Sequence, residues 1–373
     1  MALHRQAAHR RTHVPDISVN PIFATPEIGD VPKHRLPDGP TDPRVAYQIV
    51  HDELMLDGNA RTNLATFVTT WMEDEARRLM LECADKNMID KDEYPQTAEL
   101  EDRCVDILAN LWNAPRDAAV GCSTVGSSEA CMLAGLAMKR RWQKRRGIDV
   151  PIHVDGASGA MVAPFVDQEL EWDFRVGRVA SINASGHKYG LVYPGVGWAL
   201  WRDEEALPEE LVFKVNYLGG EMPTFTLNFS RPGSEVVAQY YNFVRLGFEG
   251  YQRVQQTCRD VAGAIAQGVK KMGPFNLITD GSELPVLAFA LEDDVDGYSV
   301  FDVSAQLRQR GWLVPAYTFP ENREDLAVLR VVVRNGFSRD LAELLLADLG
   351  RAVETLGREG GRQRGKEATS FHH

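Results

Sequence analysis

Cysteine is scarce in this sequence. The 373 residues include five cysteines, which is an odd number, and no two of them follow the C-x-x-C pattern. A disulfide framework pairs its cysteines, and a zinc site commonly brings two of them close together in sequence. We therefore expect reduced thiols, as in cytoplasmic proteins, and neither a disulfide-stapled fold nor a metal site.

A long apolar run and an excess of positive charge are also lacking. No run approaches the roughly 18 apolar residues that a helix needs to cross a bilayer. The formal net charge is −12 at pH 7, with 41 Lys and Arg against 53 Asp and Glu. Nucleic-acid-binding domains usually carry a basic face. We therefore expect neither membrane nor nucleic acid among the partners.

The N-terminus has no apolar segment of the kind that a signal peptide contains. MALHRQAAHRRTHV is basic and polar, and residues 15–44 carry seven prolines. Prolines at this density favour an extended chain over a packed unit. We expect an arm that ends where helical patterning begins, at Val45.

The rest of the sequence alternates helical and strand patterns, as is typical of a large α/β protein. Helical apolar spacing covers about 64–83, 98–112 and 234–272, the last with a break near Gly247 and Gly250. Apolar runs ending in small or polar residues predict strands at 118–124, 152–155, 178–183 and 195–201. Strands separated by helices or loops in this way favour a mainly parallel sheet.

The C-terminal third has a different order of predicted elements. Predicted strands at 284–291 and 326–334 alternate with predicted helices at 299–311 and 339–357. This pattern is typical of a smaller α+β lobe.

One lysine stands out by its position. Lys188 lies in SINASGHKYG, directly after His187 and just beyond a predicted strand. Most lysines are simply solvated, but a lysine that forms a Schiff base must be neutral part of the time, which burial and nearby cations promote. The small residues Ala184, Ser185 and Gly186 leave room for a cofactor. Lys188 is therefore a candidate Schiff-base lysine.

An acidic residue stands at the end of another predicted strand. Asp155, in HVDGASG, lies 33 residues before Lys188. A lone Asp at such a place more often caps a turn. The spacing, however, is about that of one strand–helix–strand unit, and parallel neighbours would bring both side chains to one edge of the sheet. An Asp paired with a pyridinium nitrogen keeps that nitrogen protonated, so that the ring can draw electrons from a carbanion.

Two serines open the helix that follows the strand at 118–124. Ser127 and Ser128 come after Gly126, and a helix N-terminus with free N–H groups binds phosphate. An ordinary serine N-cap is the commoner interpretation of such a pair alone. Together, a phosphate cradle, an acid for a ring nitrogen and a Schiff-base lysine indicate a pyridoxal phosphate site.

In these motifs the chain resembles glutamate decarboxylase, a family of fold-type I pyridoxal phosphate enzymes. The similar stretches run from about Pro32 and are DGNARTNLATF, DKNMIDKDEYP, GSSEACMLAGLAMKRRW, HVDGASG, SINASGHKYGLVYPGVGW, VNYLGGEMPTFTLNFSRPGS and QYYNFVRLGFEGY. The resemblance implies an arm and helix over 1–57, a cofactor-binding large domain over 58–258, and a small α+β domain and tail over 259–373. The large-domain sheet is expected to be mainly parallel.

The resemblance also implies the site residues. The catalytic set is Lys188, His187 and Asp155. The residues around the cofactor are Ser127, Ser128, Asp155, Ala157, Ser185, His187, Lys188 and Ser230, the last reaching the cofactor of a neighbouring subunit. The substrate set is Thr66, Phe67, Asn87 and Asp90 for the distal carboxylate and Arg330 for the α-carboxylate. The terminal His373 is expected to close the site.

The activity implied is conversion of L-glutamate to 4-aminobutanoate and carbon dioxide in the cytoplasm, by a homodimer or a hexamer of dimers. A decarboxylase for another amino acid is an alternative, but Thr66, Asn87 and Asp90 match the glutamate pocket. The other alternative is a catalytically impaired pseudoenzyme of the same family.

That second alternative arises from an internal gap near Gly147. In the family, roughly ninety residues lie between this point and the strand at 152–155, and they supply three sheet strands with their crossover helices. The absent part normally carries the residue that stacks on the pyridoxal ring and a threonine near its phosphate. The remaining strands are expected to stay neighbours, with 152–155 as a new sheet edge. A smaller departure is Gly159-Ala160-Met161, where Gly-Gly-Phe is usual.

Overall fold

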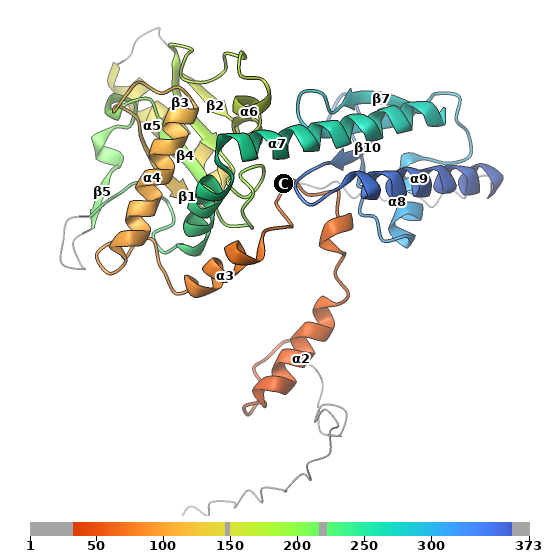
Figure 1. The fold of residues 1–373 in the computed structure, drawn as a ribbon, viewed down its shortest axis with the longest axis horizontal. Helices are drawn as coiled ribbons and strands as arrows, with labels where there is room; N and C mark the ends of the chain where they lie inside the picture. Colours follow the sequence, from red (N-terminus) through yellow and green to blue (C-terminus); the bar gives the residue numbers. More distant parts are fainter. Residues whose placement is uncertain (1–32, 146–149, 216–221, 360–373) are drawn as a thin grey trace, which may run out of the picture. The chain divides into compact units, whose positions relative to one another are not determined.

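The computed structural model describes residues 33–145, 150–215 and 222–359 (Figure 1). The predictions about most of the arm and about His373 fall outside these residues. The chain divides into two units, residues 1–58 and 59–373. In the first, helix α2 spans Pro43–Leu54, with Pro43 in its first turn and the Asp42 side chain accepting a hydrogen bond from the Arg44 N–H. No residue of α2 is buried.

The second unit contains a four-stranded sheet in the order β1-β4-β3-β2. Its strands are β1 (Val120–Thr124), β2 (Ile152–Asp155), β3 (Val179–Ala184) and β4 (Gly197–Trp201). The four predicted strands are thus neighbours in one sheet, and β2 is an edge strand, as expected. Ile152 and Asp155 are exposed there, whereas all six residues of β3 are buried.

The α/β class is confirmed, but the pairing within this sheet is mixed rather than mainly parallel. β2 and β3 are parallel, whereas β4 runs antiparallel to both β3 and β1. The cause is the connection from β3 to β4, residues 185–196, which contains no helix. A parallel return would need a longer crossover.

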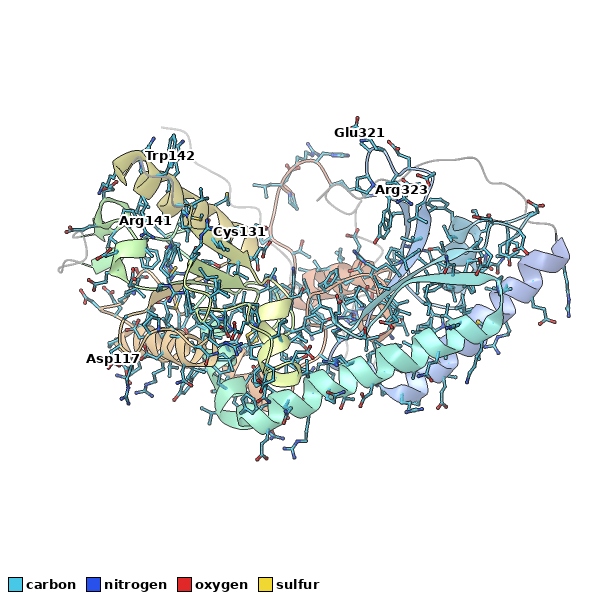
Figure 2. All side chains as sticks on the ribbon, turned by 90° about the horizontal axis from the view of Figure 1, so that it is seen from above. Asp117, Cys131, Arg141, Trp142, Glu321 and Arg323 are labelled. Carbon is cyan, nitrogen blue, oxygen red and sulfur yellow. The ribbon has the colours of Figure 1, made fainter. Side chains whose placement is uncertain are left out.

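Helices α4 (Pro95–Leu111) and α5 (Ser127–Arg145) flank this sheet, and α5 contacts β1, β2, β3 and β4. Trp142, near the C-terminal end of α5, is 66% exposed (Figure 2). Helix α7 (Ser234–Met272) runs from this lobe into the C-terminal lobe (Figure 1) and is interrupted at Gly247, where φ is 58°. The predicted break is therefore confirmed at Gly247.

The predicted helix over 64–83 is wrong for its first half. Helix α3 covers only Asp74–Glu82. The Leu64 N–H donates to the Leu313 carbonyl at 3.0 Å, and the Val332 N–H donates to the Leu64 carbonyl at 3.0 Å. Residues around Leu64 therefore adopt an extended form because tertiary partners from the C-terminal lobe satisfy their backbone groups.

The C-terminal lobe is an antiparallel sheet in the order β7-β8-β10-β9, packed against helices. Its elements are β7 (Phe275–Asp280), β8 (Val286–Leu291), α8 (Val300–Gln309), β9 (Ala316–Thr318), β10 (Ala327–Val332) and α9 (Arg339–Glu359). The short elements elsewhere are η1 (Ala60–Thr62), η2 (Gly159–Met161), α6 (Ala163–Val166), η3 (Glu204–Ala206), η4 (Glu209–Leu211), β5 (Phe213–Val215) and β6 (Met222–Thr224).

Hydrophobic cores lie in both lobes, and α7 contributes to both. Tyr251 packs in the core of the first lobe and Ile265 in that of the C-terminal lobe. Leu64 belongs to the C-terminal core, although it precedes the first lobe in sequence. Among the described residues, no helix has the length and apolarity to cross a membrane.

Candidate active site

Lys188 lies just beyond the buried strand β3. Its backbone N–H donates to the Ser185 carbonyl at 3.2 Å, which closes a tight turn at the end of the strand. The side chain is half-buried. Burial lowers the pKa of Lys188, and the Asp155 carboxylate opposes that shift. The structure therefore places Asp155 and Lys188 within electrostatic reach of each other, as the sequence predicted.

His187 is fixed by backbone groups on both sides. Its N–H donates to the Val196 carbonyl at 3.2 Å, and its Nδ1 accepts from the Gly195 N–H at 3.4 Å. A Cβ on Gly126 would lie only 2.8 Å from the ring carbon Cε1, so glycine is required there. Burial, followed by the charge of Lys188, lowers the pKa of His187 to about 4. The ring is therefore neutral at pH 7.

The residues predicted to form a phosphate cradle lie at the start of α5. The hydroxyls of Ser127 and Ser185 share a hydrogen bond, which joins the helix N-terminus to the turn that carries Lys188. The buried Glu129 accepts from the Val125 N–H at 2.8 Å and from the Leu227 N–H at 2.9 Å. Glu129 thus holds the cradle against a distant loop. Ser128, also predicted here, has an exposed side chain.

Asp155 ends β2 beside the same turn. Its Oδ1 accepts from Asn183 Nδ2 at 3.1 Å and from the Ala157 N–H at 3.1 Å. The Ala157 carbonyl in turn accepts from the Ser185 N–H at 3.0 Å. The predicted residues Asp155, Ala157 and Ser185 are thus connected to one another through hydrogen bonds.

Phe67 brings Arg330 to this group. The Lys188 Nζ lies 5.5 Å and the Arg330 guanidinium 5.0 Å from the centre of the Phe67 ring. Thr69 anchors the segment, since its N–H donates to the His187 carbonyl at 2.7 Å and its hydroxyl donates to the Lys188 carbonyl at 2.6 Å. The neighbouring Thr66 hydroxyl accepts from the Val68 N–H at 3.0 Å.

Arg330 has spare hydrogen-bonding capacity. Its Nη2 donates to the Ala65 carbonyl at 2.7 Å, and its guanidinium lies 5.6 Å from the centre of the Tyr317 ring. Its Nε is buried and has no hydrogen-bond partner in the described part of the chain. A buried guanidinium N–H without a partner is costly, so this atom is well suited to receive a carboxylate.

The other predicted substrate residues form a separate group. Asn87 Nδ2 donates to the Ser230 hydroxyl at 3.3 Å, and Asn87 Oδ1 accepts from the Arg231 N–H at 3.1 Å. The Asp90 N–H donates to the Asn87 carbonyl at 3.1 Å. Among the hydrogen bonds, ion pairs and ring contacts of the described residues, none joins this group to Lys188 or Phe67.

Sequence reasoning missed Arg334, which holds the Phe67 segment in place. Its guanidinium donates to the carbonyls of Val68, Asn63 and Ala60 and to the Thr70 hydroxyl. Burial lowers the pKa of Arg334 to about 10. The available signal was the second arginine in LRVVVR, on the strand predicted to carry Arg330.

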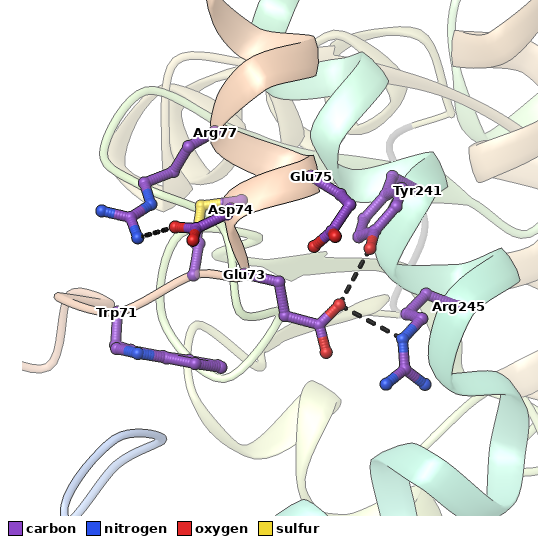
Figure 3. Close-up of a pocket in the computed structure, with 8 residues that line it drawn as sticks. Trp71, Glu73, Asp74, Glu75, Arg77, Tyr241 and Arg245 are labelled. Atoms are coloured by element: carbon purple, nitrogen blue, oxygen red, sulfur yellow. Dashed lines mark hydrogen bonds and ion pairs between the residues drawn. The ribbon is translucent and has the colours of Figure 1, made fainter.

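A cavity of about 700 Å³ lies elsewhere in this unit and contains none of the predicted site residues. Figure 3 shows Glu73 at its centre, accepting from the Tyr241 hydroxyl at 2.8 Å and from Arg245 Nε at 3.2 Å. Both arginines of this cavity are therefore already paired, Arg245 with Glu73 and Arg77 with Asp74. In the parts of the chain that the structure describes, no cluster of three His, Cys, Asp or Glu could hold a metal ion.

Comparison with known sequences decides the family. The sequence matches the pyridoxal-dependent decarboxylase conserved domain over residues 37–147 and 145–292. The chain belongs to the pyridoxal-dependent decarboxylase family. Membership confirms pyridoxal phosphate as the predicted cofactor and a carboxy-lyase as the predicted enzyme class.

Within this family the chain is similar to several glutamate decarboxylases. It is 44% identical to glutamate decarboxylase from Aliivibrio fischeri, covering 93% of this chain and 95% of the relative. It is 42% identical to the Petunia hybrida glutamate decarboxylase, covering 91% and 87%. The structure matches that of Lactobacillus brevis glutamate decarboxylase with a TM-score of 0.87 at 41% identity, covering 90% and 98%. The fold-type I prediction is thereby confirmed.

The alignment with the Aliivibrio fischeri relative is longer than the part of this chain that it uses. It extends over 439 positions, yet it uses 93% of 373 residues, or about 347, so about 90 positions have no residue of this chain. The two matches to the family domain meet at residues 145–147, where α5 ends. The internal segment predicted to be missing is therefore absent, immediately before the edge strand β2.

The residues that are present fit the cofactor. Ser127 and Ser185 face each other at a helix N-terminus, which suits a phosphate. Both hydrogen bonds to Asp155 described above reach Oδ1, which leaves Oδ2 for a ring nitrogen. Burial lowers the pKa of Lys188 and so favours the neutral amine that reacts with an aldehyde.

Proposed function

We propose that this chain is a glutamate decarboxylase that releases carbon dioxide from L-glutamate and forms 4-aminobutanoate. The observation that carries the proposal is the grouping of Lys188, Phe67 and Arg330, with the Arg330 Nε buried and free to bind a carboxylate. The names of the similar enzymes support glutamate as the substrate.

Pyridoxal phosphate, when bound, supplies an electron-poor ring that accepts the electron pair left as carbon dioxide departs. Ser127, Ser185 and the backbone N–H groups at the start of α5 would hold the phosphate. Asp155 would hold a proton at the ring nitrogen. Ala157, which is hydrogen-bonded to both Asp155 and Ser185, would line the ring site, and the neutral His187 would add no charge there.

On the substrate side, Arg330 Nε binds the α-carboxylate and orients it for loss. Phe67 shields the reacting atoms from water, which strengthens the charge interactions within the site. Lys188 Nζ is the candidate that returns a proton to Cα, because its lowered pKa eases proton donation near neutral pH. Each turnover therefore consumes one proton.

Asn87, Asp90 and Ser230 enter this scheme through a second subunit. No described contact joins them to Lys188 or Phe67 within one chain, which fits a homodimer, or an assembly of dimers, in which this group completes the distal-carboxylate pocket of the partner. The location we propose is the cytoplasm. The limits 58–258 of the large domain are also part of the proposal. Residue 258 lies inside α7, a helix that continues into the C-terminal lobe.

The proposal is tested by adding pyridoxal phosphate to the purified chain and recording the visible absorbance band and carbon dioxide release. We expect a visible band that disappears on borohydride reduction, with the cofactor then covalently attached to Lys188, and carbon dioxide release from glutamate well above that from aspartate. Lys188→Ala should abolish both, whereas the exposed Lys139→Ala should change neither. Absence of a band in the unsubstituted chain would overturn the proposal and favour the alternative, a pseudoenzyme. No contact among the described site residues supports that alternative.

A further inference from the structure

Beside Asp155 lie three polar side chains that the scheme above does not use, His153, Ser181 and Asn183. His153 and Asp155 lie two residues apart on β2 and so project from the same face. In the parallel register, Ser181 on β3 pairs with His153, and Asn183 pairs with Asp155. Ser181 and Asn183 are buried, with 1% and 0% exposure, so each of their polar atoms needs a partner.

The hydrogen bonds among these four side chains have one consistent direction. A carboxylate only accepts, so the Asn183 amide presents its NH₂ group to Asp155 Oδ1, at 3.1 Å, and its own oxygen to His153. His153 Nε2, 2.8 Å from that oxygen, must therefore donate. His153 Nδ1 then accepts from the Ser181 hydroxyl at 2.9 Å. Burial lowers the pKa of His153, so the neutral ring satisfies both contacts with a single tautomer.

The direction of this chain of bonds matters for Asp155. Each donor points toward the carboxylate, and aligned hydrogen bonds polarise one another. Without a donor at His153 Nε2, the buried Asn183 amide could turn over and present its oxygen to Asp155. Cys131 offers only a weak substitute, since its thiol lies 3.5 Å from Asn183 Oδ1.

We propose that His153 is a positioning residue for the ring nitrogen of the cofactor. Through Asn183 it holds the Asp155 carboxylate as an acceptor, with Oδ1 occupied, so that Oδ2 would serve the ring nitrogen. The inference rests on the cofactor role proposed for Asp155. His153 acts through Asn183 and takes no part in the reaction itself.

The first test compares two substitutions and two ligands. His153→Leu removes the donor, whereas the Nε2 amide of His153→Gln can still donate to Asn183. The ligands are pyridoxal phosphate and its analogue with a ring CH in place of the nitrogen. We expect His153→Leu to weaken pyridoxal phosphate about 10- to 100-fold and the analogue by no more than about twofold.

The analogue separates positioning from general stability. It cannot take a proton from or give one to Asp155, so a purely structural loss would weaken both ligands equally and overturn the inference. His153→Gln should retain most of the affinity for pyridoxal phosphate, and a loss equal to that of His153→Leu would also count against the inference. If the chain binds the cofactor but releases no carbon dioxide from glutamate, the proposed function fails. The affinities of the two variants for pyridoxal phosphate and its analogue would still test the role of His153.

A second readout needs no cofactor. Nitrogen-15 NMR of labelled histidine in the cofactor-free chain reports which ring nitrogen carries the proton. We expect protonation at Nε2 of His153 and a bare Nδ1 that shifts in Ser181→Ala. A proton on Nδ1 would reverse the chain of bonds and sink the inference whatever the enzyme does with glutamate.

Discussion

The two edge strands of the four-stranded sheet, β1 and β2, differ in what covers their outer sides. At the β1 edge, the buried Glu101 carboxylate accepts the Ser123 backbone N–H at 2.9 Å and the Ser123 hydroxyl at 2.6 Å, and Arg231 Nη2 donates to it at 2.8 Å. At the β2 edge, Ile152 and Asp155 are exposed, and no strand of the described chain pairs on the outer side.

The difference shows how a sheet edge becomes secure. Exposed backbone N–H and C=O groups are a template for unwanted pairing. The β1 edge is capped by a charge cluster whose members come from α4, β1 and the loop before α7. The β2 edge follows residues 145–147, where the two matches to the family domain meet. The polar side chains of β2 consequently find their side-chain hydrogen-bond partners on the inner side, at Ser181 and Asn183 of β3.

The largest effect is expected at the β1 edge. Arg231→Met would leave Glu101 buried without its main partner, and we expect the free energy of unfolding to fall by about 3–5 kcal/mol. Lys91→Met is the matched control, because Lys91 Nζ lies 3.4 Å from the same carboxylate but is partly exposed. It should cost no more than about 1 kcal/mol. Urea unfolding at pH 7 measures both, and equal losses would contradict the capping role of Arg231.

The change of stability with pH gives a second test of the Glu101–Arg231 pair. Burial would raise the pKa of Glu101, but Arg231, Lys91 and Ser123 together hold it below its usual 4.5. The cluster should therefore stabilise fully above about pH 4.5 and lose its effect as the pH falls through the lower folded-state pKa. In Arg231→Met the burial effect prevails, so that variant should gain stability relative to the parent chain on acidification.

The next effect is expected in the turn that follows β3. A Cβ on Gly186 would come within 2.5 Å of Gln239 Oε1 and 2.9 Å of Trp198 Nε1, both buried. We expect Gly186→Ala to cost about 2–3 kcal/mol of unfolding free energy. At Gly135, an exposed position of helix α5, a Cβ meets nothing within 4 Å, and Gly135→Ala should stabilise by about 0.5–1 kcal/mol. Thermal unfolding shifts of the same sign would refute this contrast.

A smaller effect is expected just after β2. A Cβ on Gly156 would lie 2.5 Å from the Cβ of Ala160 and 2.9 Å from the Asn183 carbonyl oxygen. We expect Gly156→Ala to cost about 1–2 kcal/mol and Ala160→Gly to restore much of that loss in the double variant. Gly159→Ala, which meets nothing within 4 Å, is the control. Strict additivity of the two substitutions in urea unfolding would argue against this pairing.

The smallest change in stability belongs to the open edge. Ile152→Lys should change the unfolding free energy by no more than about 0.5 kcal/mol, because the side chain is already exposed. It should nevertheless reduce concentration-dependent self-association, since a lysine discourages edge-to-edge pairing. Leu170→Lys, at another exposed apolar position, is the control. Light scattering over a range of concentrations that shows no difference between these variants would contradict the idea that β2 is adhesive.

Much of this molecule could be predicted from local pattern. The predicted strand at 152–155 and the predicted helix over 234–272 coincide with β2 and α7, because continuous apolar runs and 3.6-residue spacing mark such elements directly. The residues from Leu64 to Trp71 were predicted as a helix because their spacing is ambiguous. Their backbone partners, Leu313 and Val332, lie far away in sequence. No local pattern reveals such a partner.

The site residues also divide into those that a local pattern reveals and those that only the folded structure reveals. Lys188, Asp155 and Ser127 stand out because each follows or opens a regular element with small residues around it. Arg334 and Asn183 were missed because their roles come from side-chain direction, which a single sequence does not display. The reversed strand β4 was missed for a similar reason, since its direction depends on a connection without a helix.

The segment that carries Phe67 has a consequence for the order of folding. Arg334 clamps Ala60 across a sequence separation of 274 residues, so these contacts close one of the longest loops in the chain. Long loops close at an entropic cost that earlier contacts must already have offset. The pocket around Lys188 should therefore assemble late, after both lobes are in place. Cofactor added during refolding would then report the last step of the pathway, and protein that stops short of it would keep its lobes but remain colourless.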